Sequence, residues 1–264
     1  MVLGRARTTA LTAMALAVTL ALLVPLSATM TSADAAGGGY KVHSWPDPDG
    51  NLHRIRWNPC QTITYAVDLR LAGRTNAARA SALRDVRHAF HRASNRTGLK
   101  FSYSGRTTEL PRNSAHKSWS DRQHAAEIVV AWVDQSRPKF RSDLLGKTGS
   151  AYPSGVGGWM LRGWQDPNGH WQAAVGRGFV VINSAQNRLY QPGFGAGVTR
   201  GALLLHELGH AMGLDHVGST NELMYPTMLN REHSNYKHGD SRGLLKVGSR
   251  LGCIAGANQR WPQI

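Results

Sequence analysis

Three histidines and a glutamate stand close together in the stretch HELGHAMGLDH, which runs from 206 to 216. On a helix, residues four apart share a face, so the imidazoles of His206 and His210 can bind one metal ion. Gly213 can adopt the left-handed conformation that ends a helix, which lets the chain turn back and bring His216 to the same ion. Three protein ligands, with a fourth position left for water, are the arrangement of a hydrolytic zinc site.

Glu207 supplies the second part of this chemistry. It follows the first histidine by one residue, so its carboxylate lies beside the metal and can accept a proton from the water that attacks the substrate. The alternative is that the histidines are ordinary core residues and that the pattern arose by chance. Because the full pattern requires three histidines, a glutamate and a glycine at fixed offsets, it favours a catalytic metal site.

The same stretch resembles the metzincin pattern HExxHxxGxxH. The segment NELMYP, at 221–226, resembles the methionine turn of the matrixin branch of that family. The resemblance implies that Met224 forms a hydrophobic floor under the zinc. It also implies that Tyr225 and Pro226 line the wall of the pocket for the residue after the scissile bond. For Met224 the alternative is an ordinary core methionine.

The resemblance is specific over 198–227 and loose over 60–253, and it implies a fold and an activity. The fold is a zincin-like α+β domain: a twisted mixed sheet of about five strands, a long N-terminal helix, an active-site helix and a C-terminal helix. The activity is that of a zinc metalloendopeptidase. Matrixins usually bind a second, structural zinc and calcium, but 134–147 contains no histidine. One catalytic zinc is therefore expected, and calcium is left open.

The elements that must position the site follow from residue periodicity and turn residues. Strands are expected over 62–67, 100–103, 128–133 and 179–183, with a shorter edge strand over 144–152 and a hairpin over 159–175 that turns at 166–169. Helices are expected over 76–96, capped by Asn76, over 199–212, and over 240–251, capped by Asp240. This order predicts helices packed on a mixed sheet. By family analogy, the substrate is expected along the edge strand near 145–151.

The N-terminal residues have the features of a secretory signal peptide. Arg5 and Arg7 precede an uncharged run over 10–26, and small residues around Ala33 and Ala35 suit a signal peptidase. We therefore expect a signal peptide over 1–35, cleaved after Ala35 or Ala36, and a secreted protein; an uncleaved signal anchor is the alternative. Residues 36–57 are expected to form a flexible leader with room for one hairpin, and 58–264 the catalytic domain. The short leader and the missing cysteine propeptide motif resemble secreted bacterial matrixin-like proteins.

The sequence contains two cysteines, Cys60 and Cys253. Export would place them in an oxidising compartment, where we expect them to form a disulfide. The alternative is that one thiolate caps the zinc in a latent form.

The sequence carries 31 basic and 16 acidic residues, for a formal net charge of +15. The basic residues are spread from Arg54 to Arg260 without a dense block or interleaved aromatic residues, which argues against a nucleic-acid partner. The positive charge could serve to bind acidic polymers of the cell surface. The alternative is a basic surface that contributes to solubility and binds no particular partner. We expect a secreted monomeric endopeptidase that acts on peptides or proteins and is not inserted in a membrane. The alternative functions are a zinc-containing binding or adhesion domain and a zinc hydrolase of cell-wall amides.

Overall fold

A computed structural model of the chain describes residues 31–34, 39–112 and 126–257. The predicted signal peptide therefore lies outside the described residues, except for its last part. That part, Thr31–Asp34, forms a short strand, β1. Among the described residues, no helix is both long enough and apolar enough to cross a membrane.

Five strands form the main sheet, in the order β5-β4-β6-β8-β7. Their bounds are β4 Thr62–Asp68, β5 Lys100–Arg106, β6 Ile128–Val133, β7 Gly155–Gln165 and β8 Trp171–Asn183. Strands β5, β4, β6 and β8 are parallel to one another, and β7 is antiparallel to β8. The predicted mixed sheet of about five strands is confirmed, and β7 lies at its edge.

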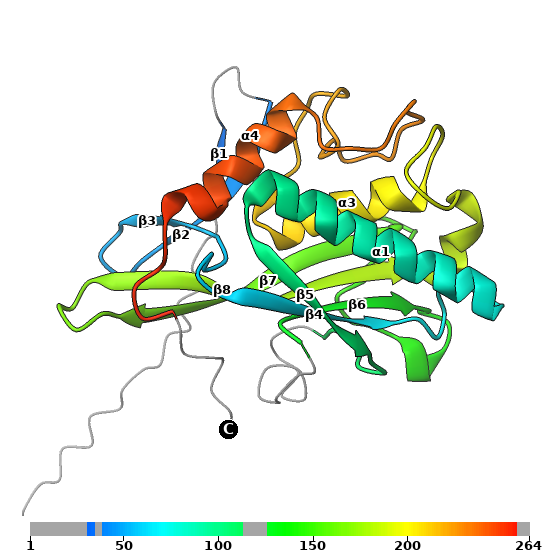
Figure 1. The fold of residues 1–264 in the computed structure, drawn as a ribbon, viewed down its shortest axis with the longest axis horizontal. Helices are drawn as coiled ribbons and strands as arrows, with labels where there is room; N and C mark the ends of the chain where they lie inside the picture. Colours follow the sequence, from blue (N-terminus) through cyan, green and yellow to red (C-terminus); the bar gives the residue numbers. More distant parts are fainter. Residues whose placement is uncertain (1–30, 35–38, 113–125, 258–264) are drawn as a thin grey trace, which may run out of the picture.

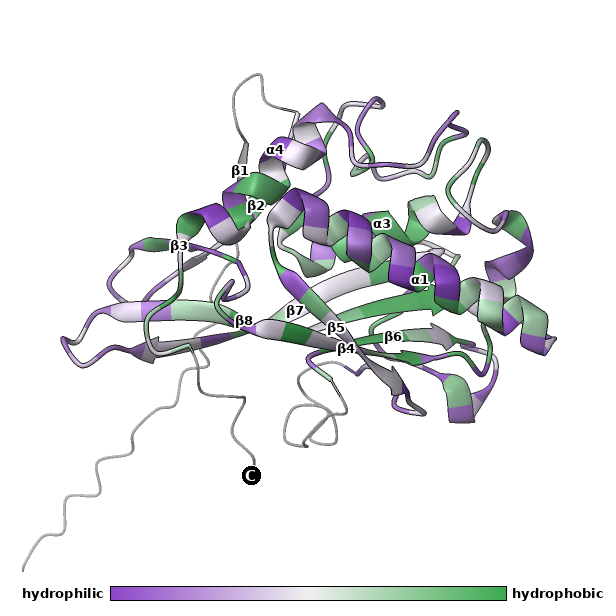
Figure 2. Ribbon diagram, viewed as in Figure 1, coloured by the Kyte–Doolittle hydropathy of each residue, from purple (hydrophilic) through white to green (hydrophobic). Residues whose placement is uncertain are grey.

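Helix α1, Asn76–Thr97, packs against one face of this sheet (Figure 1). Its N-cap is Thr75, one residue before the predicted Asn76, because the Thr75 side chain accepts a hydrogen bond from the amide of Ala78. Gly98 ends the helix in the left-handed conformation. Figure 2 shows several hydrophilic residues along α1, whereas Ala82, Val86 and Phe90 of the same helix are buried.

Helix α3, Arg200–Ala211, lies between α1 and the β7 end of the sheet (Figure 1). Nearly all of its residues are buried, so it is a core helix and not a surface one. Asp85 of α1 accepts hydrogen bonds from the Gly193 amide and from the Arg200 guanidinium. This buried contact fixes the start of α3 against α1.

Helix α4, His238–Val247, begins before the predicted Asp240, which occupies its third position. The Asp240 carboxylate reaches back to the amide of Lys237. A short 3-10 turn, Ser249–Leu251, follows the helix. The predicted disulfide between Cys60 and Cys253 is present and joins the segment before β4 to the segment after α4. The cysteines therefore do not reach the three histidines.

A second, smaller sheet combines β1 with β2 Lys41–Pro46, β3 Leu52–Arg54 and β9 Leu214–Asp215. The expected hairpin of the leader is thus present as β2 and β3. The segment is not flexible throughout, however, because Val42, Ile55 and Trp57 are buried in the core. Apolar side chains at these positions hold the segment against the domain.

One expected strand is absent. Residues 144–152 form only an isolated bridge between Thr148 and Ala151, and Gly149 has a φ of 64°. A left-handed residue in the middle of the segment produces a turn instead of a strand. The predicted hairpin over 159–175 is present as β7 and β8, with its turn at Asp166 to Gly169.

Candidate metal centre

Helix α3 carries the first two histidines of the candidate site. The hydroxyl of Thr199 accepts a hydrogen bond from the amide of Ala202 and so caps the helix. The apolar turn from Ala202 to Leu205 is buried. His206 and His210 therefore lie one turn apart on a rigid element, in the arrangement that their spacing predicted. The side chain of His206 is almost completely buried, with a relative exposure of 4%.

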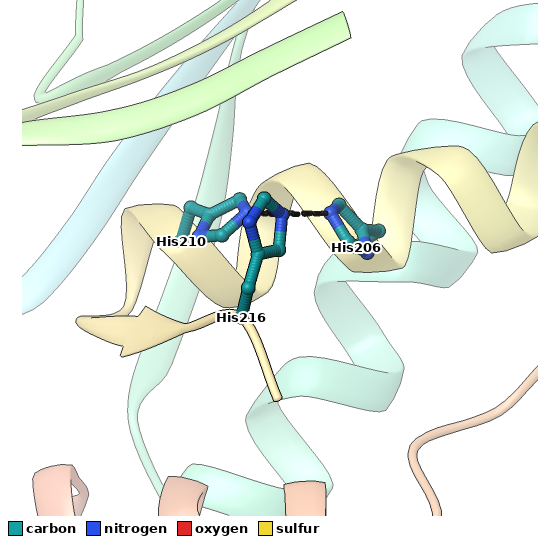
Figure 3. A group of neighbouring side chains, drawn as sticks. All are labelled: His206, His210 and His216. Carbon is teal, nitrogen blue, oxygen red and sulfur yellow. Dashed lines mark hydrogen bonds between the residues drawn. The ribbon is translucent and has the colours of Figure 1, made fainter. Parts of the chain in front are cut away.

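The third histidine arrives through a tight turn at Gly213. This glycine has a φ of 100°, and a side chain there would meet the carbonyl oxygen of Ile55 at 2.5 Å. Glycine is therefore required both by the backbone conformation and by the space available. The chain reverses into β9, which pairs with β2, and places His216 opposite α3 (Figure 3).

The Nε2 atoms of the three histidines converge on one point, and their separations are 3.1, 3.1 and 3.3 Å. Nδ1 of His206 faces the Leu223 carbonyl at 2.8 Å, and Nδ1 of His210 faces the Leu214 carbonyl at 2.9 Å. Because a carbonyl only accepts, both Nδ1 atoms must carry hydrogen, which leaves lone pairs on Nε2. Lone pairs that face one another repel unless a cation lies between them.

The spacing also matches the size of zinc. A tetrahedral zinc ion bound at about 2.0–2.1 Å requires ligand nitrogens about 3.3–3.4 Å apart. His206, His210 and His216 form the one group of potential metal ligands within the described residues in which three donor atoms lie this close together. The donor set and its geometry therefore fit zinc.

Burial keeps these imidazoles neutral. The pKa of His206 is lowered to about 4 and that of His210 to about 3, chiefly by burial and in smaller part by the neighbouring imidazoles. Burial also lowers the pKa of His216, while the charge of Asp215 acts in the opposite direction and raises it. Because a metal binds only the deprotonated ring, the three side chains are in the metal-binding state at neutral pH.

Glu207 projects from the same helix towards β7. It is 5% exposed, and burial raises the pKa of its carboxyl to about 8, while a hydrogen bond from the Gly157 amide acts in the opposite direction. A Cβ atom at Gly155 would stand 2.7 Å from Oε1 of Glu207, and one at Gly157 would overlap its carbonyl oxygen. The glycines of β7 therefore allow the strand to approach α3 closely enough to hold the carboxylate.

The segment expected to form a methionine turn passes directly beneath α3. Met224 is 1% exposed, and a Cβ atom at Gly209 would lie 2.5 Å from its sulfur. The Leu223 carbonyl accepts a hydrogen bond from Nδ1 of His206, and the Leu223 amide donates one to the Asp240 carboxylate. Tyr225 is half-buried and Pro226 is exposed. The structure thus brings Met224 against the helix between His206 and His210.

The loop that follows is attached to α3 at two points. The phenol of Tyr236 donates to the Leu205 carbonyl at 2.7 Å, and the hydroxyls of Ser234 and Thr199 are 2.7 Å apart. Arg231 donates to the carbonyls of Asn221 and Glu222. The loop conformation could not be deduced from sequence, because these partners are distant along the chain.

Several residues near the site were not identified from sequence. Burial raises the pKa of Asp240 to about 6, although three backbone amides, those of Leu223, Met224 and Lys237, lower it. His43 of β2 lies against Trp159 and has Nε2 3.9 Å from Asp215, whose carboxylate accepts the His216 amide. The sequence indicates Asp240 only as a helix cap. No pattern within 41–57 indicated that this segment would reach the histidines.

Comparison with known proteins agrees with this geometry. The sequence profile of the matrixin family matches residues 56–247, which include β4 to α4 and all three histidines. No curated protein matches the chain.

Proposed function

Because the chain belongs to the matrixin family, whose members are zinc metalloproteases, we propose that it is a secreted endopeptidase with Glu207 as its general base. The observation that carries the proposal is the convergence of three Nε2 atoms within 3.3 Å of one another, with the Glu207 carboxylate on the adjacent position of the same helix. His206, His210 and His216 are the proposed zinc ligands.

Zinc held by these imidazoles would supply a Lewis acid that polarises the scissile carbonyl and lowers the pKa of the attacking water. Beside a bound dication the pKa of Glu207 would fall, so that its carboxylate accepts the proton of that water and passes it to the nitrogen of the leaving amine. The Gly157 amide orients the carboxylate, and burial excludes competing solvent. Leu223 and Leu214 fix the imidazoles of His206 and His210 through their carbonyls.

An extended substrate would lie along β7. This strand ends the main sheet, runs beside α3 and places Gly155 and Gly157 next to Glu207. The outer edge of a terminal strand can pair with the backbone of an added peptide. This replaces the expected position near 145–151, where no strand forms. Tyr225 and Pro226 are the proposed wall of the pocket after the scissile bond.

Secretion rests on the N-terminal signal sequence and on the disulfide. A disulfide between Cys60 and Cys253 persists in an oxidising compartment. Cleavage after Ala35 or Ala36 would remove β1 together with the signal peptide and leave β2 in place. N-terminal sequencing of the protein recovered from culture medium tests this part of the proposal.

A peptide library cleaved by the purified protein tests the activity. We expect cleavage of internal peptide bonds, loss of activity with 1,10-phenanthroline, and recovery with one equivalent of zinc. The His210→Ala variant should neither retain zinc nor cleave. Stoichiometric zinc without cleavage of any peptide would favour a binding domain. Cleavage of cell-wall amides in place of peptides would favour an amidase.

A further inference from the structure

A groove of about 640 Å³ lies at the end of the domain where the N-terminal hairpin meets the segment after α4. Its walls come from β2, β3, the start of β8, the end of α4 and the segment up to Ile254. This volume is within the range of about 300–1,000 Å³ that is typical of ligand sites. We call this site the basic groove.

The charged side chains that line the groove are basic. Arg54 and Lys246 are exposed, Arg56 is half-buried, and the described lining contains no aspartate or glutamate. Nη1 of Arg56 donates to the Gly252 carbonyl at 2.8 Å, which holds its guanidinium at the groove wall. Burial lowers the pKa of Arg56, and the nearby charge of Arg54 lowers it further. Like charges held together in this way attract an anionic ligand.

The groove also has an apolar part, which narrows the class of ligand. Leu52 is 65% exposed and Leu251 is 40% exposed, although both are large hydrophobic side chains. Tyr40, Val42, Ala173 and Ile254 complete the apolar lining. A purely anionic polymer would leave these side chains without a partner. A peptide that alternates acidic and apolar side chains would cover both parts.

One strand separates the groove from the candidate metal centre. Successive side chains of a strand point to opposite faces. Val42 and Ser44 line the groove, whereas His43 between them faces Trp159 and lies 3.9 Å from Asp215, which precedes the ligand His216. A protein bound in the groove would therefore be held close to the three histidines.

We propose that the basic groove binds an acidic peptide segment with apolar side chains and acts as a second binding site for protein substrates. The binding half of this inference stands independently, and the substrate half rests on the proposed endopeptidase function. Occupation of the groove raises the effective concentration of the rest of the substrate at the metal centre. Substrates that carry such a segment are therefore cleaved at lower concentrations.

Binding is tested by fluorescence anisotropy in the zinc-loaded Glu207→Gln background, so that the probe is not cleaved. The probe is a labelled peptide that alternates glutamate and leucine. We expect the double change Arg54→Glu and Lys246→Glu to weaken binding by about five- to thirtyfold. Leu52→Ser should weaken binding of this probe but not of polyglutamate. The double change Arg84→Glu and Arg106→Glu, at exposed arginines of α1 and β5 outside the groove, alters the net charge by the same amount. It serves as the matched control and should change binding less than twofold.

Two results would overturn the proposal. If the control double change of Arg84 and Arg106 weakens binding as much as that of Arg54 and Lys246, the ligand responds to the overall charge of the protein and not to the groove. If polyphosphate competes more strongly than the peptide and Leu52→Ser has no effect, the groove belongs to an anionic polymer. Thermal unfolding of each variant establishes that the fold is retained.

A kinetic measurement separates the groove from the proposed function. Wild-type protein should cleave a short peptide with and without a glutamate-leucine extension, with a KM about tenfold lower for the extended form. The variant with Arg54→Glu and Lys246→Glu should show the same KM for both peptides and should cleave the short peptide with wild-type kinetics. Equal KM values for both substrates would overturn the role in substrate binding. No cleavage of either substrate would contradict the endopeptidase function, and the anisotropy result would still decide the binding site.

Discussion

The carbonyl oxygen of Leu223 lies 2.8 Å from Nδ1 of His206, while the amide of the same residue donates to the Asp240 carboxylate at 2.7 Å. The adjacent Met224 amide donates to the other oxygen of Asp240 at 3.1 Å. A buried carboxylate on α4 therefore fixes the turn that orients an imidazole on α3. Groups that orient a metal ligand in this way contribute to metal affinity.

Asp240→Asn should lower zinc affinity. The substitution keeps the size of the side chain but places an NH₂ group against at least one backbone amide, which leaves a buried donor without an acceptor. We expect zinc affinity to fall by about 10–100-fold in a competition titration with a chelator. Asp49→Asn, at an exposed aspartate in the turn between β2 and β3, is the matched control. Equal affinities in both variants would mean that Asp240 does not position His206.

The same carboxyl should make stability depend on pH. Its pKa is raised to about 6 in the folded protein from 3.8, chiefly by burial. Between these values the folded chain holds a proton that the unfolded chain has released, so the free energy of unfolding falls as pH rises. Above about pH 6 this contribution is constant. We expect a decrease on the order of 1–3 kcal/mol across the window.

Urea unfolding at pH 4, 5, 6 and 7 measures this dependence. Other groups titrate in the same range, so the quantity of interest is the difference between wild type and Asp240→Asn. That difference should decrease from pH 4 to pH 6, because the asparagine cannot titrate. A difference that is constant, or that increases with pH, would show that the carboxyl is not protonated preferentially in the folded state.

Gly157→Ala should disturb both the fold and the activity. The added methyl group would overlap the carbonyl oxygen of Glu207, so β7 and α3 must separate. We expect a loss of about 2 kcal/mol in stability and of about 100-fold in kcat/KM, because small displacements of a catalytic group are costly. Gly195→Ala is the control, since no atom lies within 4 Å of a Cβ there. Wild-type kinetics in Gly157→Ala would show that close packing on β7 does not hold Glu207.

The fold was predictable where periodicity was strong. The expected helices over 76–96 and 199–212 agree with α1 and α3 to within one residue at each end, since these ends carry cap residues and glycine. The prediction of a strand over 144–152 was wrong, because the positive φ of Gly149 that interrupts the segment cannot be deduced from composition. The packing of 41–57 on the domain was also missed, because Val42, Ile55 and Trp57 are too widely spaced for a clear pattern.

The candidate site was predictable only as far as local spacing determines geometry. The offsets between His206, His210 and Gly213 fix their relative positions through one helix and one turn. Asp240 and Gly157 could not be assigned in this way, because they reach the site through α4 and β7, whose packing depends on contacts distant in sequence. A single acidic residue or glycine carries no signal of that role.

The most direct test of the proposed function compares zinc content and peptide cleavage in Glu207→Gln and wild type. The amide occupies the space of the carboxylate but cannot accept the proton, while His206, His210 and His216 are unchanged. We predict one zinc per chain in both proteins and a loss of about two to four orders of magnitude in kcat for the variant. Undiminished cleavage by a zinc-loaded Glu207→Gln protein would contradict the role of Glu207 as the general base.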